Sequence, residues 1–313
     1  MGFENNINRA DVSGIIPVST SVELINTVST ESSNVMRLGR RLRDMSVYEN
    51  DMPVLSALAT AYFPDGDTGL VETSETNWED VKLYAKDISC IVPISKNVLN
   101  DSSVPIWDEV KPIMQTAAGA AIDKAILYGT NKPVAWPTAI VVAALAAGHN
   151  VSLAGFADAY DAILGESGLF GLVEVDGFGV SGVIADLSMK GKLRGTRDAM
   201  GQPIFSRDPA VANQYMLDGA PIFFPENGAG STTYKMVAGD WKQLVYSMRQ
   251  DMEFEVYTQG VITDAAGKVV YNLMQQRMAA IMLTMRVGFA LPNPINWVNP
   301  DDSTRYPFSY LTA

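Results

Sequence analysis

The side chains with which enzymes most often do chemistry are scarce in this chain. His149 is the only histidine and Cys90 the only cysteine in 313 residues. Neither a metal site of several histidines nor an intrachain disulfide can therefore form. The neighbours Gly148 and Asn150 predict that His149 is exposed in a loop, and the apolar neighbours of Cys90 predict that it is buried. We assign no catalytic, cofactor-binding or metal-binding residue and do not expect an enzyme.

One glycine pattern matches the sequence of a phosphate-binding motif. Gly177, Gly179 and Gly182 fit G-x-G-x-x-G, and Asp198 follows near the spacing of a ribose-binding acid. That motif needs a helix that opens at the third glycine, so that the helix N-terminus faces the phosphate. Here residues 183–185 are Val-Ile-Ala and predict a buried strand. A nucleotide site is therefore disfavoured.

Pairs of acidic residues could in principle serve acid–base catalysis. They include Asp65 with Asp67 and Glu253 with Glu255. Acids two positions apart on a strand share one face, where water solvates both and no pocket is evident that would adapt them to catalysis. We interpret these pairs as solvated surface. A soluble α/β enzyme that uses carboxylates is the disfavoured alternative.

The charge of the chain also limits its partners. The net charge of −12 argues against a surface that grips nucleic acid, because that affinity comes mainly from Lys and Arg. The dense basic cluster Arg37, Arg40, Arg41 and Arg43 favours a solvated or ion-paired helix face over phosphate contact. The longest apolar run, 139–148, is too short to span a bilayer, and no secretory signal is expected.

Two strands joined by a turn dominate the last quarter of the chain. From Leu244 to Val256 apolar residues alternate with mostly polar ones, which predicts a strand. Residues 264–267 supply turn chemistry, and alternation resumes over 281–291 until Pro292 stops it. The sequence thus predicts a long antiparallel ribbon over about 237–290. Met278, Met282 and Met285 also fit helical spacing, so a helix there stays open.

A long helix is predicted over about 105–128. Asp108 and Glu109 lie at its positive N-terminal end, and Gly129 follows as a stop. Apolar residues recur along it at helical spacing, and the alanine-rich stretch 117–121 permits close contact with a sheet; the apolar positions are Ile106, Val110, Ile113, Ala117, Ala121 and Ala125. Pro112 should kink the helix or mark its start.

Two further segments predict contacts with other chains. In the N-terminal arm, Ser19 and Thr20 can cap a helix through Val22, Ile25 and Val28. Residues 52–81 predict a hairpin that turns at 65–69. A hairpin of this length without its own core needs another surface to order it.

The sequence of several segments resembles that of the tailed-bacteriophage major capsid proteins of the Hong Kong 97 type. The matching segments are Val237-Ala-Gly-Asp-Trp241, Asp123-Lys-Ala-Ile-Leu-Tyr-Gly129 and Arg286-Val-Gly-Phe-Ala-Leu-Pro-Asn-Pro294. The resemblance extends over about 15–298 and implies an α+β fold. Its expected domains are an N-terminal arm (1–50), an extended loop (51–82), a peripheral domain (83–130 and 231–290) with the long spine helix on the ribbon, and a mixed α/β axial domain (131–230 and 291–313).

The resemblance implies a structural virion protein. Such a protein assembles as hexamers and pentamers into an icosahedral shell around phage double-stranded DNA, which it contacts weakly and without sequence specificity. Implied partners are a separate scaffolding protein, a portal and a decoration protein, with assembly in the host cytoplasm. An encapsulin-like bacterial nanocompartment is the alternative. No cross-link between subunits is expected, because residues 52–81 contain no lysine.

Charged residues on the arm, the loop and the ribbon are the candidate assembly interface. They are Arg37, Arg40, Arg41, Asp65, Asp67, Glu72, Arg249, Asp251 and Glu253.

Overall fold

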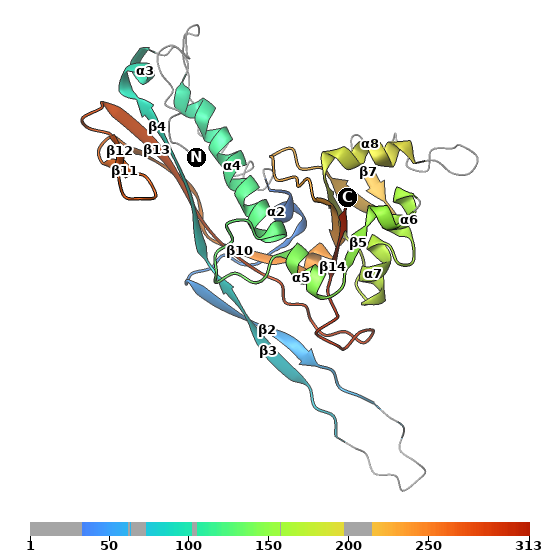
Figure 1. Cartoon of the computed structure of the whole chain (residues 1–313). Coiled ribbons are helices and arrows are strands. Elements are labelled where there is room, and N and C mark those ends of the chain that lie inside the picture. Colours follow the sequence, from blue (N-terminus) through green and yellow to red (C-terminus); the bar gives the residue numbers. More distant parts are fainter. Residues whose placement is uncertain (1–32, 62, 64–72, 102–104, 157, 197–214) are drawn as a thin grey trace.

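Two sheets and a projecting hairpin organise the molecule (Figure 1). The computed structural model describes residues 33–61, 63, 73–101, 105–156, 158–196 and 215–313. Asp65, Asp67, Glu72 and the predicted arm helix lie outside these ranges. Within them, no helix is long and apolar enough to cross a membrane.

The four-stranded sheet contains the predicted ribbon. Its strands are β1 (Arg40–Arg41), β10 (Val245–Tyr257), β13 (Met278–Ala290) and β4 (Lys86–Ser95), in that order across the sheet. β10 and β13 pair antiparallel, which confirms the strands predicted there, the methionine-rich one included. The turn at 264–267 joins a smaller hairpin, β11 (Val261–Thr263) and β12 (Val269–Asn272). Residues 237–239, the expected start of the ribbon, pair in the other sheet instead.

Helix α4 (Ile106–Tyr128) lies along this sheet and confirms the predicted long helix (Figure 1). Pro112 lies near its beginning, and Gly129 ends it with a positive φ of 76°. Only part of the predicted stripe packs. Ile106, Val110 and Ala125 are buried, whereas Ile113, Ala117 and Ala121 are exposed. Within the alanine-rich stretch the buried residues are 118–120, and Ala118 packs with Val110 and Met114 on sheet residues that include Ile281 and Leu283.

The burial pattern of α4 predicts which alanine will not tolerate a larger side chain. Ala118→Phe should lower the free energy of unfolding of the unassembled subunit by about 1–3 kcal/mol, because Ala118 is 3% exposed in a packed core. The same substitution at the exposed Ala121 should change it by less than about 0.5 kcal/mol. Urea denaturation of both variants tests the assignment. Equal losses would show that both faces of α4 are in tight contact.

The second sheet has six strands in the order β5-β14-β9-β6-β8-β7. Helices α5 (Ile140–Ala146), α6 (Ala159–Leu164), α7 (Leu169–Val175) and α8 (Leu187–Gly195) surround it, with short 3-10 turns at Leu153–Gly155 and Trp241–Gln243 (Figure 1). The strands are β5 (Asn150–Ser152), β6 (Gly182–Ala185), β7 (Tyr215–Leu217), β8 (Ala220–Phe223), β9 (Tyr234–Gly239) and β14 (Phe308–Thr312). The strand predicted at 183–185 is confirmed as part of β6. The C-terminal strand β14 lies between β5 and β9, a pairing that local pattern did not predict.

Candidate assembly surfaces

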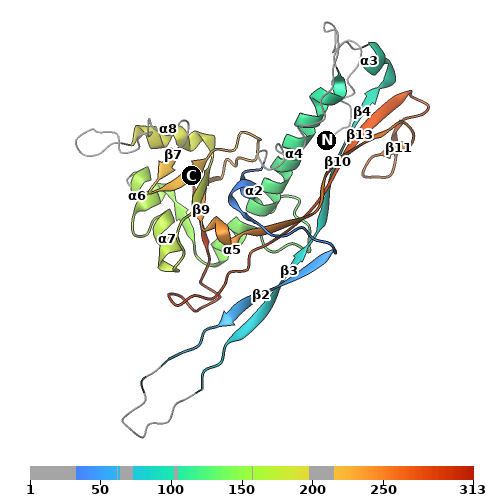
Figure 2. The same ribbon diagram turned by 180° about the vertical axis from the view of Figure 1, so that it is seen from behind.

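The hairpin of β2 (Glu49–Ala57) and β3 (Asn77–Tyr84) projects away from both sheets (Figures 1 and 2). Its strands pair only with each other within the described chain. Toward the tip the side chains that the structure describes are exposed, with Trp78 at 62% and Phe63 at 99%. A two-stranded ribbon is at best marginally stable alone. These apolar side chains therefore have the character of a contact surface for another chain.

The root of the hairpin is fixed to the rest of the molecule. Leu83 and Ala85 are fully buried with Met45, Val245 and Ala290 in one small core. Farther out, the main-chain N–H of Ile295 donates to the carbonyl of Leu55 over 3.4 Å. The direction in which the hairpin leaves the molecule is therefore set by its own chain, while the tip is left for a neighbour.

The lysine nearest the hairpin tip is held as a cation. Lys82, in β3, places Nζ 2.5 Å from Oε1 of Glu49 and 3.8 Å from Oδ1 of Asp51. The hydrogen bond with Glu49 raises the pKa of Lys82, with further help from the charge of Asp51. An amine must be deprotonated to attack a carboxamide. This pairing therefore supports the expectation of uncrosslinked subunits.

We predict that mature particles boiled in detergent with reductant run as one band near 33.9 kDa. Lys82 is paired, and Lys86 lies at the start of β4, outside the hairpin, where it donates to the hydroxyl of Tyr48. Gel electrophoresis checks this directly. A ladder of covalent oligomers that disappears in a Lys82→Arg variant would contradict it and identify the linking amine.

The predicted basic cluster divides between two elements. Arg37 lies in α2 (Asn34–Leu38), 4.8 Å from the ring centre of Phe223, and Arg40 and Arg41 form β1. Arg41 donates to Asp44 over 2.9 Å, and this hydrogen bond raises the pKa of Arg41. All three arginines are exposed. A solvated, partly ion-paired surface is confirmed, but only Arg37 is on a helix.

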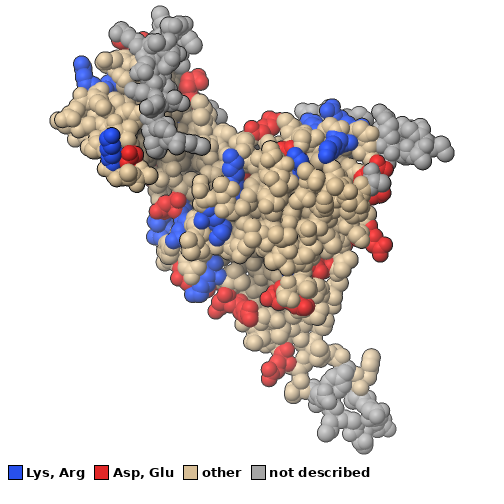
Figure 3. Space-filling view, viewed as in Figure 1, with Lys and Arg blue, Asp and Glu red and all other residues tan. Residues whose placement is uncertain are grey.

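The ribbon residues of the candidate interface lie beside this cluster. β1 pairs with Val245 and Tyr246 of β10, the strand that carries Arg249, Asp251 and Glu253. Arg249 is half-buried and Asp251 is exposed. The negative charge of Asp251 contributes to the raised pKa of Arg41. Glu253 accepts from Gln250 over 2.8 Å. The fold thus brings Arg40, Arg41 and Asp251 close to one another. Arg37 lies apart from them on α2, and Glu253 lies farther along β10. Figure 3 shows basic side chains near the root of the hairpin and again over α8.

Asp123 anchors the start of the described chain and was not predicted. This α4 residue is 1% exposed and accepts from Ser33 Oγ at 2.5 Å, from the main-chain N–H groups of Asn34 and Val35 at 3.1 and 3.2 Å, and from Asn227 Nδ2 at 3.0 Å. Burial raises the pKa of Asp123 and these hydrogen bonds oppose the rise. An acid inside a predicted helix was the only signal, because its partners are distant in sequence.

The prediction for His149 is wrong: the residue is 5% exposed. Its Nε2 lies 3.0 Å from Oδ2 of Asp176, and its Nδ1 lies 3.1 Å from the carbonyl oxygen of Phe308. The same carboxylate accepts from the N–H of Tyr306 at 2.7 Å and from Asn299 Nδ2 at 2.8 Å. Glycine and asparagine beside it indicated a loop, but the C-terminal strand covers that loop. The cluster joins the segment before β14 to α7.

The remaining chemical candidates are structural in this fold. The three glycines follow α7, and the last one begins β6, so the chain continues from them as a strand rather than as the helix that the phosphate-binding motif requires. Cys90 is half-buried on β4 rather than fully buried, and burial raises the pKa of its thiol. Over the described ranges, no group of three or more His, Cys, Asp or Glu residues could hold a metal ion.

Comparison with known proteins identifies relatives over most of the chain. The model of the family described as "Phage capsid family" matches residues 14–295. The chain is 24% identical over 262 residues to the major capsid protein of Staphylococcus phage 80alpha, covering 82% of this chain and 76% of that one. It is 27% identical over 294 residues to the major capsid protein of Klebsiella oxytoca phage phiKO2, covering 89% and 66%. A solved structure from Microbacterium phage Oxtober96 superposes with a TM-score of 0.77 at 29% identity, covering 98% and 99%.

Proposed function

Because the chain belongs to the phage capsid family, we propose that it assembles as hexamers and pentamers into an icosahedral shell around phage double-stranded DNA. The protein is a structural component of the capsid, self-assembles into oligomers and is located in the virion. Its relatives favour neither the nanocompartment nor the enzyme alternative.

One observation carries the proposal: the hairpin projects beyond its own subunit and exposes aromatic side chains there. Exposed apolar area in a projecting element is stabilised only when a neighbour covers it. In a closed assembly every hairpin meets the same surface on the next copy, so each subunit both gives and receives the contact. Several modest contacts per subunit then combine into a stable shell.

Charge supports a particular partner for the hairpin. Asp65, Asp67 and Glu72 give the hairpin an acidic sequence near its tip, and Arg37, Arg40 and Arg41 are exposed on each subunit. We place the hairpin of one copy near this basic cluster of the next, an arrangement that would lose strength as salt is added. Arg249, Asp251 and Glu253 would border the same contact.

The finer organisation of the particle follows the family expectation. We propose the same division of the chain into domains: an arm (1–50), an extended loop (51–82), a peripheral domain (83–130 and 231–290) and an axial domain (131–230 and 291–313). A separate scaffolding protein, a portal and a decoration protein are the proposed partners, with assembly in the host cytoplasm. The net charge of −12 supports weak, sequence-independent contact with the packaged DNA.

Electron microscopy of the purified protein tests this function. Expressed alone or with its scaffold, the chain should form capsomers or closed shells that light scattering and negative stain detect. A strictly monomeric compact species at high concentration, with scaffold present, would contradict the proposal.

A further inference from the structure

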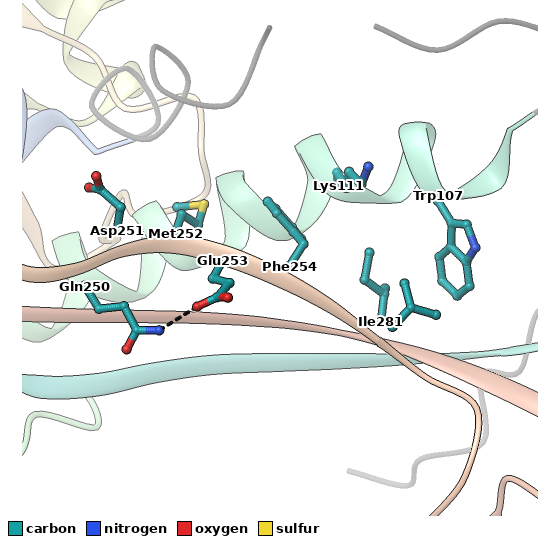
Figure 4. A pocket seen from close by; sticks show the side chains of 9 residues that line it. Trp107, Lys111, Gln250, Asp251, Met252, Glu253, Phe254 and Ile281 are labelled. Carbon is teal, nitrogen blue, oxygen red and sulfur yellow. Dashed lines mark hydrogen bonds between the residues drawn. The ribbon is translucent and has the colours of Figure 1, made fainter. Parts of the chain in front are cut away.

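A groove separates the first half of α4 from β10. It encloses about 540 Å³ and is lined by Trp107 and Lys111 of α4, by Ile281 of β13, and by Gln250, Asp251, Met252, Glu253, Phe254 and Val256 of β10. Figure 4 shows Met252 and Phe254 pointing toward α4, while Gln250 and Glu253 point the other way. Val256 is 52% exposed. The groove therefore has an apolar floor that the described chain leaves partly open.

The strand beside this groove has an unpaired edge. β1 pairs with β10 only at Val245 and Tyr246. Beyond β1, the N–H of Leu42 donates to the carbonyl of Tyr246 and the N–H of Met45 to the carbonyl of Met248, each over 2.8 Å. From Arg249 to Tyr257 no strand of the described ranges covers this edge. Free main-chain groups beside an apolar groove suit an added strand, which gains hydrogen bonds and buries alternate side chains.

We infer that Ile15–Val18 of the same chain occupies this groove as an added strand on β10. Ile15, Ile16 and Val18 are β-branched and suit a strand, and Pro17, which lacks an N–H, is tolerated at a sheet edge. Their side chains would cover Phe254 and Val256. The inference does not depend on shell formation and can be tested on the unassembled subunit.

The arm begins close enough to the groove, and is long enough, for Ile15–Val18 to reach it. Ser33 is held against Asp123 of α4, and Asp123 lies about 24 Å along the helix axis from Trp107 at 1.5 Å per residue. The helix predicted for the arm would span about 14 Å over 20–28, and residues 29–32 would add up to about 13 Å. The arm is therefore long enough for Ile15–Val18 to reach the groove. A short tether also raises the effective concentration of the segment there.

A photo-crosslinker at the groove identifies the occupant. With p-benzoylphenylalanine in place of Val256, illumination should link this position to residues 13–20 within one chain, seen as a monomer on a denaturing gel and mapped by mass spectrometry. The matched control is the same probe at Val261, which is also 52% exposed but outside the groove, and it should give no such link. A dimer band, or a link to residues 58–76 or to any other segment, would overturn the inference.

Hydrogen exchange provides a second measurement that does not require a probe. Amides of residues 249–257 should exchange at least about tenfold faster in an Ile15→Asp, Ile16→Asp variant than in the parent chain. The charge-matched control Asn5→Asp, Asn6→Asp should leave those rates unchanged. Equal rates in the parent chain and the Ile15, Ile16 variant would overturn the inference.

Discussion

Replacing residues 58–76 by Asn-Gly is expected to abolish shell assembly while the subunit stays folded. Ala57 and Asn77 are the last paired residues of β2 and β3, so a two-residue turn closes the shortened hairpin without strain. The described tip residues beyond Leu58 are exposed in the subunit, so their removal leaves no cavity. The replacement therefore acts on the interface between subunits. At about 1.4 kcal/mol per factor of ten, removing about 3 kcal/mol of interface free energy weakens association by more than about 100-fold.

Particle yield after sedimentation, counted by negative stain, measures this effect. Near-ultraviolet circular dichroism checks that the subunit core is unchanged. A variant in which 58–76 become a Gly/Ser linker of equal length separates chain length from side-chain contact, and it should fail in the same way. Normal particles from the shortened hairpin would show that the tip contributes nothing to assembly.

Asp123→Ala is expected to cost the subunit on the order of 3–5 kcal/mol, because it leaves several buried donors without an acceptor. Those donors include Ser33 Oγ, the N–H groups of Asn34 and Val35, and Asn227 Nδ2. Asp123→Asn should cost less, since one acceptor oxygen is kept. Urea denaturation gives the free energy, and hydrogen exchange over 34–38 shows whether α2 leaves α4 before the rest unfolds.

The matched control for this prediction lies on the same helix. Asp108 is an exposed acid of the first turn of α4, paired with Lys111 at 3.4 Å, and Asp108→Ala should cost less than about 1 kcal/mol. A loss at Asp123 no larger than the loss at Asp108 would contradict the anchoring role and would mean that water satisfies the freed donors.

Local pattern alone predicted much of the secondary structure. Alternation over 244–256 and 281–291 predicted the two long strands, and helical spacing of apolar residues with Gly129 as the stop predicted α4. These periodicities arise from the geometry of a strand or a helix itself. The scarcity of histidine and cysteine pointed away from an enzyme without any structure. The resemblance of several sequence segments then indicated the phage capsid family, which the comparisons confirmed.

Only the tertiary structure decided which surfaces are buried. Val110 and Ala117 belong to one predicted stripe of α4, yet packing on the sheet buries Val110 and leaves Ala117 exposed. His149 was predicted to be exposed, but the C-terminal strand covers it. The sequence assigned no role to Asp123, which is buried between α2 and Asn227. The sequence by itself determined the elements and the family. Burial and hydrogen bonding between residues far apart in the chain could come only from the folded structure, because they depend on which distant segments meet.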